Sequence, residues 1–378
     1  MMICNFNYNI AIKWIYMTKS RQKVAVGMSG GVDSSVAAYK LIQEGYDVEG
    51  IFMKNWEEDD GDECNSKDDY KDAARVSKLL NIKLNLVNFS DKYWTNVFEV
   101  FVDDLKKGFT PNPDIFCNRE IKFNQFYKYA KTLGFDLIAT GHYAKKQTGE
   151  RIELHMPKDK SKDQTYFLYT LKEKILKDIL FPLEDLYKDE VKKIANELDL
   201  GLDNKKESMG ICFIGKRKFS RFIDSYVQPV CGPIINYENK EKIGIHNGLS
   251  KYTIGQRKGI NIGGMKDSED SPWYVIDKDI ENNSLTVSQN QSPLFYSGEI
   301  ELSDFSSINK AYDNQDIKVR FRHGGALKKG KLNIKDNVYT ITLYEKERGI
   351  AKGQAAVIYS GTECIGGGTV VSKCLSVN

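Results

Sequence analysis

The sequence has no long apolar run and little bias of charge. Nowhere do its 378 residues form the uninterrupted apolar stretch of roughly 20 residues that a membrane-spanning helix needs. The 55 Lys and Arg residues nearly balance the 52 Asp and Glu residues, which leaves a net charge of +3. This balance neither requires nor excludes a nucleic-acid partner. With 41% hydrophobic residues, a chain of this length is expected to form two or three soluble domains with real cores.

The cysteines lack the short spacings that are typical of metal sites. Seven cysteines are scattered along the chain without a C-x-x-C pair, and none of the four histidines belongs to a closely spaced Cys/His set. Zinc sites and iron–sulfur clusters usually take ligands from such spacings, so neither is expected. In a reducing cytosol the thiols stay free, and a disulfide is more typically transient and catalytic than structural.

Residues 1–22 precede the first strand-like segment. They lack the basic region, long apolar region and small-residue cleavage site of a signal peptide, and Met17 is a second possible start. We expect a disordered extension or a mis-assigned start, and a cytoplasmic protein.

Strand-like and helix-like segments alternate from residue 23 to about residue 203. Apolar runs predict strands at 23–27, 47–54, 82–89 and 135–142. Helices are predicted at 33–45, ending at Gly45, and at about 70–80, 91–107 and 117–133. This alternation predicts an α/β domain in which helices cover both faces of a parallel sheet. Ligands of such domains bind at the carboxyl ends of the strands.

The second half of the chain differs in composition and in hydrophobic pattern. From about residue 204 glycines are more frequent, and short alternating segments predict antiparallel strands, with hairpins in DIENNSLTV and LNIKDNVYTITL. We expect a small β-rich linking domain at 204–285 and a C-terminal β-barrel or sandwich at 286–378.

The stretch VAVGMSGGVDSS, residues 24–35, leaves a strand through two glycines and enters a helix. Consecutive backbone N–H groups and the helix N-terminus predict a cradle for an anion. The lysine of a Walker A loop is missing, which disfavours a P-loop NTPase. Asp33 suits a magnesium-bound pyrophosphate, and Ser29, Ser34 and Ser35 suit its phosphate oxygens. An ordinary glycine turn before a capped helix is the alternative.

SGGVDSS resembles the signature of the PP-loop ATP pyrophosphatases, which adenylate a carbonyl oxygen and release pyrophosphate. In order, the chain also contains GIFMKNW, TPNPDIFCNREIKF, ATGHYA, KDQTYFLY, GICFIGKRKF and YTIGQRKGI. This ordered set resembles the bacterial tRNA-specific 2-thiouridylases over nearly everything after residue 22. The resemblance implies an adenine nucleotide alpha hydrolase-like domain and ATP-dependent 2-thiolation of the wobble uridine of tRNA. The oxygen must first leave as an AMP ester, and a cysteine persulfide then supplies sulfur.

Two cysteines stand in contexts that suit this chemistry. Cys117 is predicted to begin a helix beside Arg119, which would lower the pKa of its thiol, and the resemblance makes it the nucleophile. The residues alone also allow a packing cysteine after a simple turn. Cys212 lies in a glycine-bracketed basic loop, and the resemblance makes it the persulfide carrier. Met209 stands where the family commonly has threonine.

The resemblance also assigns binding residues. Catalytic roles fall to Asp33 and Asp114 beside the two cysteines, and magnesium would come with ATP through Asp33. The ATP contacts are Gly27, Met28, Ser29, Gly30, Gly31, Val32, Asp33, Ser34, Met53 and Gly141. Contacts with the target base are Asn112, Pro113 and Asp114, and contacts with tRNA are Lys162, Asp163, Gln164, Arg320 and Phe321, where tyrosine is commoner than Phe321. His142 suits either a general base or a structural role.

The expected partners are the lysine, glutamate and glutamine tRNAs and a cysteine desulfurase or sulfur-relay protein. Local clusters of Lys and Arg, such as KRK at 216–218, fit a nucleic-acid partner. Two alternatives remain: another PP-loop ligase that uses ammonia, which needs no paired thiols, and a non-catalytic RNA-binding protein that keeps the fold. A cluster-dependent thiouridylase is disfavoured by the missing C-x-x-C pairs.

Overall fold

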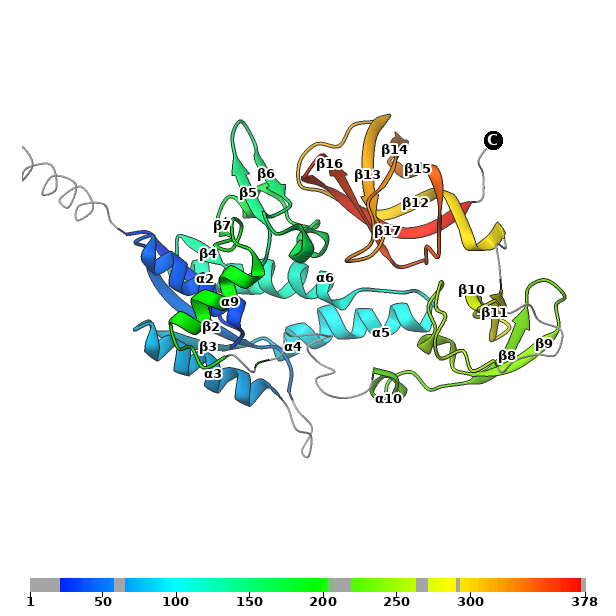
Figure 1. Cartoon of the computed structure of the whole chain (residues 1–378), viewed down its shortest axis with the longest axis horizontal. Coiled ribbons are helices and arrows are strands. Elements are labelled where there is room, and N and C mark those ends of the chain that lie inside the picture. The colour runs from blue at the N-terminus through cyan, green and yellow to red at the C-terminus, as the bar shows by residue number, and fades with distance from the viewer. Residues whose placement is uncertain are drawn as a thin grey trace, which may run out of the picture.

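The computed structural model describes residues 21–57, 65–202, 205, 219–262, 271–289 and 293–374. The predictions about residues 1–20, Met209 and Cys212 lie outside these residues. Within them the chain forms three sheets, which lie in three lobes (Figure 1). No helix in the described part is long and apolar enough to cross a membrane. The boundaries proposed at 203/204 and 285/286 stay predictions.

The first lobe contains the predicted parallel sheet. Its strand order is β3-β2-β1-β4-β7, and every neighbouring pair is parallel. The strands are β1 (Lys23–Gly27), β2 (Asp47–Lys54), β3 (Leu84–Asn88), β4 (Leu137–Ala139) and β7 (Ile179–Leu180). Alternate residues of β1 enter different cores: Val24 and Val26 belong to one cluster of buried residues, and Ala25 to the other. The central strand is therefore buried on both faces, as its unbroken apolar sequence predicts.

Helices cover both faces of this sheet. One face packs against α2 (Val32–Gln43), α3 (Asn65–Leu79) and α9 (Lys188–Glu197). The other packs against two interrupted helices, α4 (Ser90–Tyr93), η1 (Trp94–Phe98) and α5 (Glu99–Lys106), then α6 (Pro113–Cys117), η2 (Asn118–Gln125) and α7 (Phe126–Thr132). In both, the middle part is π-helical. Short elements complete the lobe: η3 (Lys160–Lys162), η4 (Thr165–Phe167) and α8 (Glu173–Leu176).

The predicted start of the second long helix is wrong. The helix begins at Pro113 rather than at Cys117, because the Asn112 side chain caps it by accepting a hydrogen bond of 3.0 Å from the Asp114 N–H. Asparagine at the N-cap followed by proline at the first helical position is a strong start signal. Cys117 consequently lies a full turn inside the helix.

The second lobe begins with α10 (Phe219–Asp224) and holds a four-stranded sheet in the order β10-β11-β8-β9. Its elements are β8 (Cys231–Asn236), β9 (Lys242–Asn247), η5 (Leu249–Lys251), β10 (Tyr274–Asp279) and β11 (Ser284–Ser288). The predicted hairpin at DIENNSLTV is confirmed as the antiparallel pair β10–β11. The expectation of antiparallel strands throughout is wrong for β8 and β11, which pair in parallel.

The third lobe is the predicted barrel. It follows η6 (Pro293–Phe295) and consists of β12 (Tyr296–Ser307), β13 (Gln315–Arg320), β14 (Lys328–Lys335), β15 (Val338–Arg348), β16 (Ala355–Ser360) and β17 (Glu363–Cys374). Because β12 pairs with both β15 and β17, these strands close on themselves. A hairpin from the first half, β5 (Lys145–Thr148) and β6 (Ile152–His155), extends this sheet through the pairing of His155 with Glu363.

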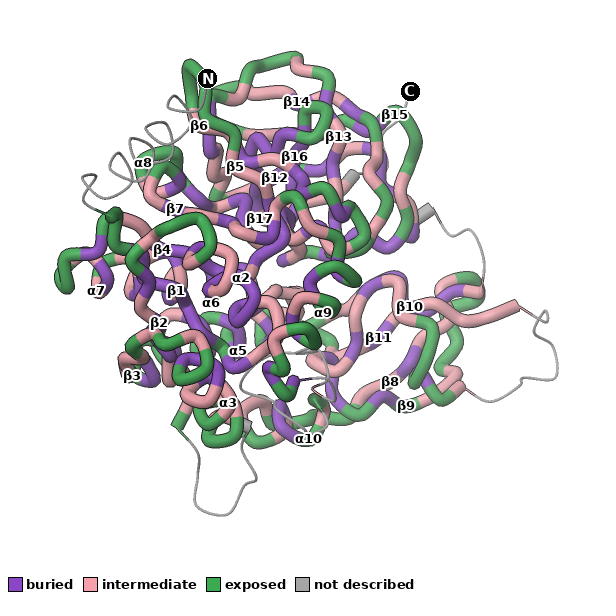
Figure 2. The backbone as a smooth tube through the Cα atoms, turned by 60° about the vertical axis from the view of Figure 1, so that its left-hand side comes forward, coloured by how far each residue is buried: buried purple, intermediate pink, exposed green. Residues whose placement is uncertain are grey.

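A buried ion pair joins the barrel to the first lobe. Arg320 of β13 contacts Asp163 at 2.7 Å, and their side chains are 12% and 2% exposed. The hydroxyl of Tyr166 donates across the same junction to the carbonyls of Phe321 and Ala355. In Figure 2, most of β17 is coloured as buried where the barrel approaches the first lobe. The junction is therefore an internal packing surface of the chain.

Replacing Asp163 by alanine leaves the Arg320 guanidinium buried without its carboxylate. We expect Asp163→Ala to lower the free energy of unfolding by about 3–5 kcal/mol. As a control, Glu197→Ala removes an exposed pair with Lys193 and should cost less than about 1 kcal/mol. Urea denaturation measures both, and equal losses would show that this pair does not hold the junction.

Candidate active site

The loop between β1 and α2 has the geometry of an anion cradle. Gly30 has a φ of +74°, and a Cβ there would clash with the backbone carbonyl of Asp69 on α3. Gly31 is the N-cap of α2 and provides no side-chain cap. The first N–H groups of the helix are therefore available to an anion, as the sequence predicts. Ser29 and Ser34 face each other across the loop, with their hydroxyl oxygens 3.2 Å apart.

Two more glycines bring predicted ATP residues against this loop. A Cβ on Gly141, just after β4, would lie 2.7 Å from the carbonyl carbon of Asp33 and from the Ser34 nitrogen. A Cβ on Gly27 would lie 3.1 Å from the Met53 Cε. β1 and β4 are neighbours, so Gly27 and Gly141 lie at the carboxyl edge where such sheets bind ligands. The predicted residues converge, and their contacts with ATP stay predictions.

The side chains of Met28 and Val32 point into the core and not toward the cradle. The Met28 side chain is buried in the core, and its N–H donates to the Ile51 carbonyl at 2.9 Å. Val32 packs against the same core from α2. Neither side chain faces the cradle, so these residues can contribute to nucleotide binding through their backbones.

Asp33 has two partners that the sequence did not reveal. Its carboxylate oxygens lie 2.6 and 2.8 Å from the Lys188 Nζ, and the Tyr143 hydroxyl donates to one of them at 3.0 Å. Each oxygen therefore accepts a charge-assisted hydrogen bond, and the Asp33 side chain is 35% exposed. The assignment of Asp33 as a magnesium ligand stays a prediction. The described residues also contain no group of three or more His, Cys, Asp or Glu side chains placed to hold a metal.

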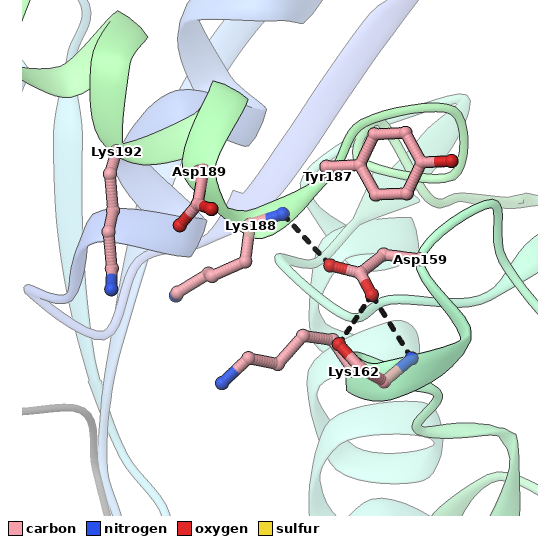
Figure 3. A pocket seen from close by; sticks show the side chains of 7 residues that line it. Asp159, Lys162, Tyr187, Lys188, Asp189 and Lys192 are labelled. Atoms are coloured by element: carbon pink, nitrogen blue, oxygen red, sulfur yellow. Dashed lines mark hydrogen bonds between the residues drawn. The ribbon is translucent and has the colours of Figure 1, made fainter.

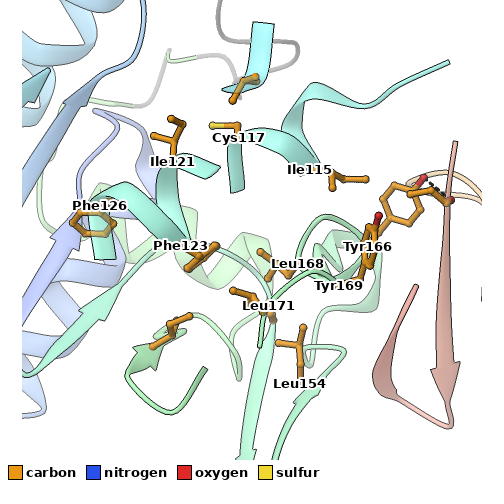
Figure 4. Packing of buried hydrophobic residues seen from close by; sticks show 14 of the residues in the cluster. Ile115, Cys117, Ile121, Phe123, Phe126, Leu154, Tyr166, Leu168, Tyr169 and Leu171 are labelled. Atoms are coloured by element: carbon orange, nitrogen blue, oxygen red, sulfur yellow. Dashed lines mark hydrogen bonds between the residues drawn. The ribbon is translucent and has the colours of Figure 1, made fainter. Parts of the chain in front are cut away.

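Cys117 is a buried residue of the second long helix. It is 3% exposed and lies in the cluster shown in Figure 4, near Ile115 and Ile121. The expected activation by the helix dipole loses its basis, because the effect fades beyond the first turn. Arg119 also points elsewhere, since it pairs with Glu120 at 2.7 Å and stacks over Phe116. The thiol lies where α6 becomes the π-helical η2, a kind of irregularity that is frequent at functional sites.

Asp114 is the unusual acid of this region. Burial raises the pKa of its carboxyl above the usual range, and the charges of Lys122 and His323 offset this only in part. His323 belongs to the barrel and packs against Phe167 with ring centroids 4.6 Å apart. The predicted base-contact segment Asn112–Asp114 therefore lies close to the barrel.

His142 is structural in this arrangement. Its Nδ1 lies 2.8 Å from the Thr140 hydroxyl oxygen. Burial lowers the pKa of the imidazole well below its ordinary value. A histidine that stays neutral and packs against Phe123 fits the structural alternative better than a general base.

The predicted tRNA contacts meet at the junction with the barrel. Asp163 and Arg320 pair with each other, and Phe321 is buried beside them. The side-chain oxygen of Gln164 accepts from the Tyr143 N–H at 2.9 Å. Lys162 lines a cavity near Lys188. The structure brings these residues together, and their contact with RNA stays a prediction.

Three family models match the chain in succession. They are the tRNA methyl transferase HUP domain over residues 22–216, the tRNA methyl transferase PRC-barrel domain over 220–289 and the aminomethyltransferase beta-barrel domain over 286–370. The curated tRNA-specific 2-thiouridylase MnmA of Hahella chejuensis is 46% identical over 94% of this chain and 99% of its own length. This chain belongs to the tRNA-specific 2-thiouridylase family.

Other relatives give the same result. The 2-thiouridylase of Pseudomonas entomophila is 47% identical over 93% of this chain and 95% of its own length. That of Idiomarina loihiensis is 46% identical over 94% and 98%. The predicted family and its three-part fold are confirmed, and the HUP domain implies the use of ATP.

In this 2-thiouridylase, the described residues on the two sides of Cys212, Lys205 and Phe219, contact different parts of the first lobe. On one side, Lys205 pairs with Asp69 and Asp72 of α3, each at 2.7 Å, and Asp69 also contacts Gly30 of the loop. On the other, the ring of Phe219 lies 6.2 Å from that of Phe101. The segment therefore begins beside the PP-loop and ends on the helix layer that contains Cys117.

Adding a methyl group at Gly141 should disturb the cradle. Because the new Cβ would meet the backbone of Asp33 and Ser34, we expect Gly141→Ala to weaken ATP binding by at least about tenfold, or ~1.4 kcal/mol. At Gly149 a Cβ would meet nothing closer than 4.0 Å, so Gly149→Ala serves as the control. Calorimetric titration with ATP measures the effect, and unchanged affinity in both variants would contradict the cradle.

Asp114 should reduce stability when it ionises. Its pKa is higher in the folded protein than the ordinary 3.8, so stability falls as the pH rises from that value through the folded pKa. Asp114→Asn cannot ionise, and we expect it to be more stable than the wild type at pH 7, with the difference shrinking toward pH 4. Urea unfolding at both pH values measures this, and a less stable variant at pH 7 would contradict the assignment.

Proposed function

We propose that this protein replaces the C2 oxygen of the wobble uridine in tRNA anticodons by sulfur, with ATP as the activating substrate. The observation that carries the proposal is an uncapped, glycine-dependent loop at the carboxyl edge of a parallel sheet, in a chain that matches 2-thiouridylases over nearly their whole length. The loop supports ATP activation, and the family indicates the substrate.

In the first step the C2 oxygen of the uracil attacks the α-phosphorus of ATP. A C2–O–P bond forms, the bond from the α-phosphorus to the bridging oxygen breaks, and pyrophosphate leaves with the electron pair. The N–H groups at the start of α2 and the hydroxyls of Ser29 and Ser34 bind the phosphates. We propose that magnesium arrives as the counter-ion of ATP.

In the second step a persulfide on Cys212 attacks C2 and displaces AMP. The Cys117 thiolate then attacks the inner sulfur of Cys212, which leaves C2=S on the base and a Cys117–Cys212 disulfide that a reductant must reopen. Asp114, whose pKa burial raises, suits the transfer of the N3 proton that the uracil loses on adenylation and regains on release of the product.

The lengths of chain between Cys212 and its two described anchors allow the two cysteines to meet. Cys212 is seven residues from Lys205 and seven from Phe219. An extended chain covers about 3.3–3.6 Å per residue, so the thiol can lie up to about 25 Å from either anchor. Because the anchors lie beside the PP-loop and on the helix layer of Cys117, delivery of sulfur by a loop movement on tRNA binding is feasible.

The segment before Cys117 supports a flipped base as the substrate. The Thr110 N–H donates to the Lys352 carbonyl of the barrel at 2.8 Å, and Gly108 lies against Ile280 of the second lobe. Asn112, Pro113 and Asp114 follow where the three lobes approach one another, so a base taken out of its stack can be enclosed there. Lys162 would contact the tRNA, and Asp163, Gln164, Arg320 and Phe321 would position it by fixing the barrel against the first lobe. We propose a cysteine desulfurase or relay protein as the sulfur donor.

Nucleoside mass spectrometry tests the proposal. Unmodified tRNA is incubated with the protein, ATP, magnesium, a cysteine desulfurase with cysteine as the persulfide donor and a thiol reductant, and is then digested. We expect 2-thiouridine only when ATP is present, and a loss of product of about 10³-fold or more in Cys117→Ser and Cys212→Ser, because a hydroxyl cannot form a persulfide. Cys231→Ser, at an exposed cysteine of β8, is the matched control. Full activity in either of the first two variants would contradict the assigned roles.

A further inference from the structure

Lys122 is a half-buried lysine of the π-helical segment η2, which follows Cys117 directly. In the part of the chain that the structure describes, no carboxylate lies within 4.0 Å of its ammonium group, and no acceptor forms a hydrogen bond with it. Arg119, the other cation of η2, is already paired with Glu120. Withdrawing a charge from water costs free energy unless a partner compensates it. Lys122 therefore has the character of a residue that binds an anionic substrate.

Two groups in different parts of the site feel the charge of Lys122. Burial raises the pKa of the Asp114 carboxyl, and the charge of Lys122 is the largest effect that opposes this rise. Burial lowers the pKa of the His142 imidazole, and the charge of Lys122 lowers it further. Asp114 belongs to the predicted base-contact segment, whereas His142 follows Gly141 at the carboxyl edge of the sheet. The ammonium group thus acts on both.

The helix that carries Lys122 connects these two parts. It begins at the cap formed by Asn112. Further along, Phe123 packs against the His142 ring with the centroids 5.8 Å apart (Figure 4 labels Phe123). Gly141, next to His142, lies against the backbone in the first turn of α2. Lys122 is therefore placed between the segment expected to hold the base and the loop expected to hold the phosphates.

The lysines of α9 lie on the other side of the sheet. Lys188 and Lys192 line a cavity of about 450 Å³ (Figure 3), and the Lys188 Nζ lies 2.6 Å from the Asp33 carboxylate. α9 packs on one face of the parallel sheet, whereas α6 and η2 pack on the other. A phosphate group that is bonded to a base near Cys117 therefore needs a cation from the face of α6 and η2.

We propose that Lys122 binds the α-phosphate of ATP during adenylation of the uracil and holds it until AMP leaves. The inference rests on the proposed function, which supplies both steps. In the first, the C2 oxygen bonds to the α-phosphorus while the bond to the bridging oxygen breaks, and negative charge spreads over the non-bridging oxygens. In the second, the C2–O bond breaks and AMP leaves with the electron pair. An ammonium group fixed at this phosphate stabilises the charge in both transition states.

The rate of pyrophosphate release in a single turnover, at saturating tRNA and ATP, tests the inference. Lys122→Gln removes the charge, and we expect it to slow release by about 10²–10³-fold without changing the affinity for tRNA. Lys122→Arg keeps a cation and should recover much of the rate. Lys128→Gln removes an exposed lysine further along the same interrupted helix and should keep the rate of the wild type.

Calorimetric titration of the full-length protein gives a second readout without turnover. Because AMP retains the α-phosphate and pyrophosphate does not, the two ligands separate the proposed contact from a general effect on the cradle. We expect Lys122→Gln to weaken AMP binding by about tenfold and to leave the binding of inorganic pyrophosphate unchanged. Lys128→Gln should bind both ligands as the wild type does.

Three results would overturn the inference. A wild-type rate in Lys122→Gln would exclude a contact in the transition state. Equal weakening of AMP and pyrophosphate binding would show that Lys122 only supports the fold of the site. Weaker tRNA binding with an unchanged rate at saturation would make it a contact with the RNA backbone. Failure of the proposed function gives a different signature, in which the wild type itself binds AMP but releases no pyrophosphate with tRNA and ATP.

Discussion

The carboxylate of Asp33 is the point on which the site depends. It lies in the first turn of α2, beside the phosphate cradle, and its charge is balanced by Lys188 of α9 and a hydrogen bond from Tyr143. The backbone N–H of Tyr143 in turn donates to Gln164, and the preceding residue, Asp163, pairs with Arg320 of the barrel. A continuous series of polar contacts therefore runs from the PP-loop to the third lobe. Residues far along the chain, in α9 and in the barrel, therefore help to fix the position of the cradle.

The second constraint on the site is that two of its glycines lie against the backbone of neighbouring elements. Gly30 touches α3, and Gly141 touches the first turn of α2, so the loop is enclosed by backbone on two sides. A side chain at either position would push the cradle open. The Cys212 segment begins at Lys205, which pairs with the same Asp69 that Gly30 touches. The segment that would bring sulfur is thus anchored beside the loop that would activate the base.

The sequence predicts the cradle well because its signal is local. Two glycines between a buried strand and a helix define both the loop and its ligand class, and the hairpins at 279–284 and 335–338 carry equally local turn signals. The start of the Cys117 helix also carries a local signal, since Asn112 is its N-cap and Pro113 its first residue. Residues from several parts of the chain bury Cys117, so the sequence around it does not indicate its burial.

Other features depend on partners far away along the chain. Lys188 is 155 residues from Asp33, and Tyr143 is 110 residues from it, so nothing near the motif indicates either contact. Alternating polarity predicts β11 as a strand but carries no information on its parallel pairing with β8. The addition of β5 and β6 to the barrel rests on the pairing of His155 with Glu363, and it too is fixed only when the lobes dock.

The most direct measurement of the central claim follows one oxygen atom. A tRNA whose wobble uracil carries oxygen-18 at C2 is thiolated with ATP, and the released AMP is analysed by mass spectrometry. If the base is adenylated before sulfur arrives, the label appears in the phosphate of AMP in proportion to the 2-thiouridine formed. Thiolated tRNA accompanied by unlabelled AMP would contradict the account, because the oxygen would then leave without passing through the nucleotide.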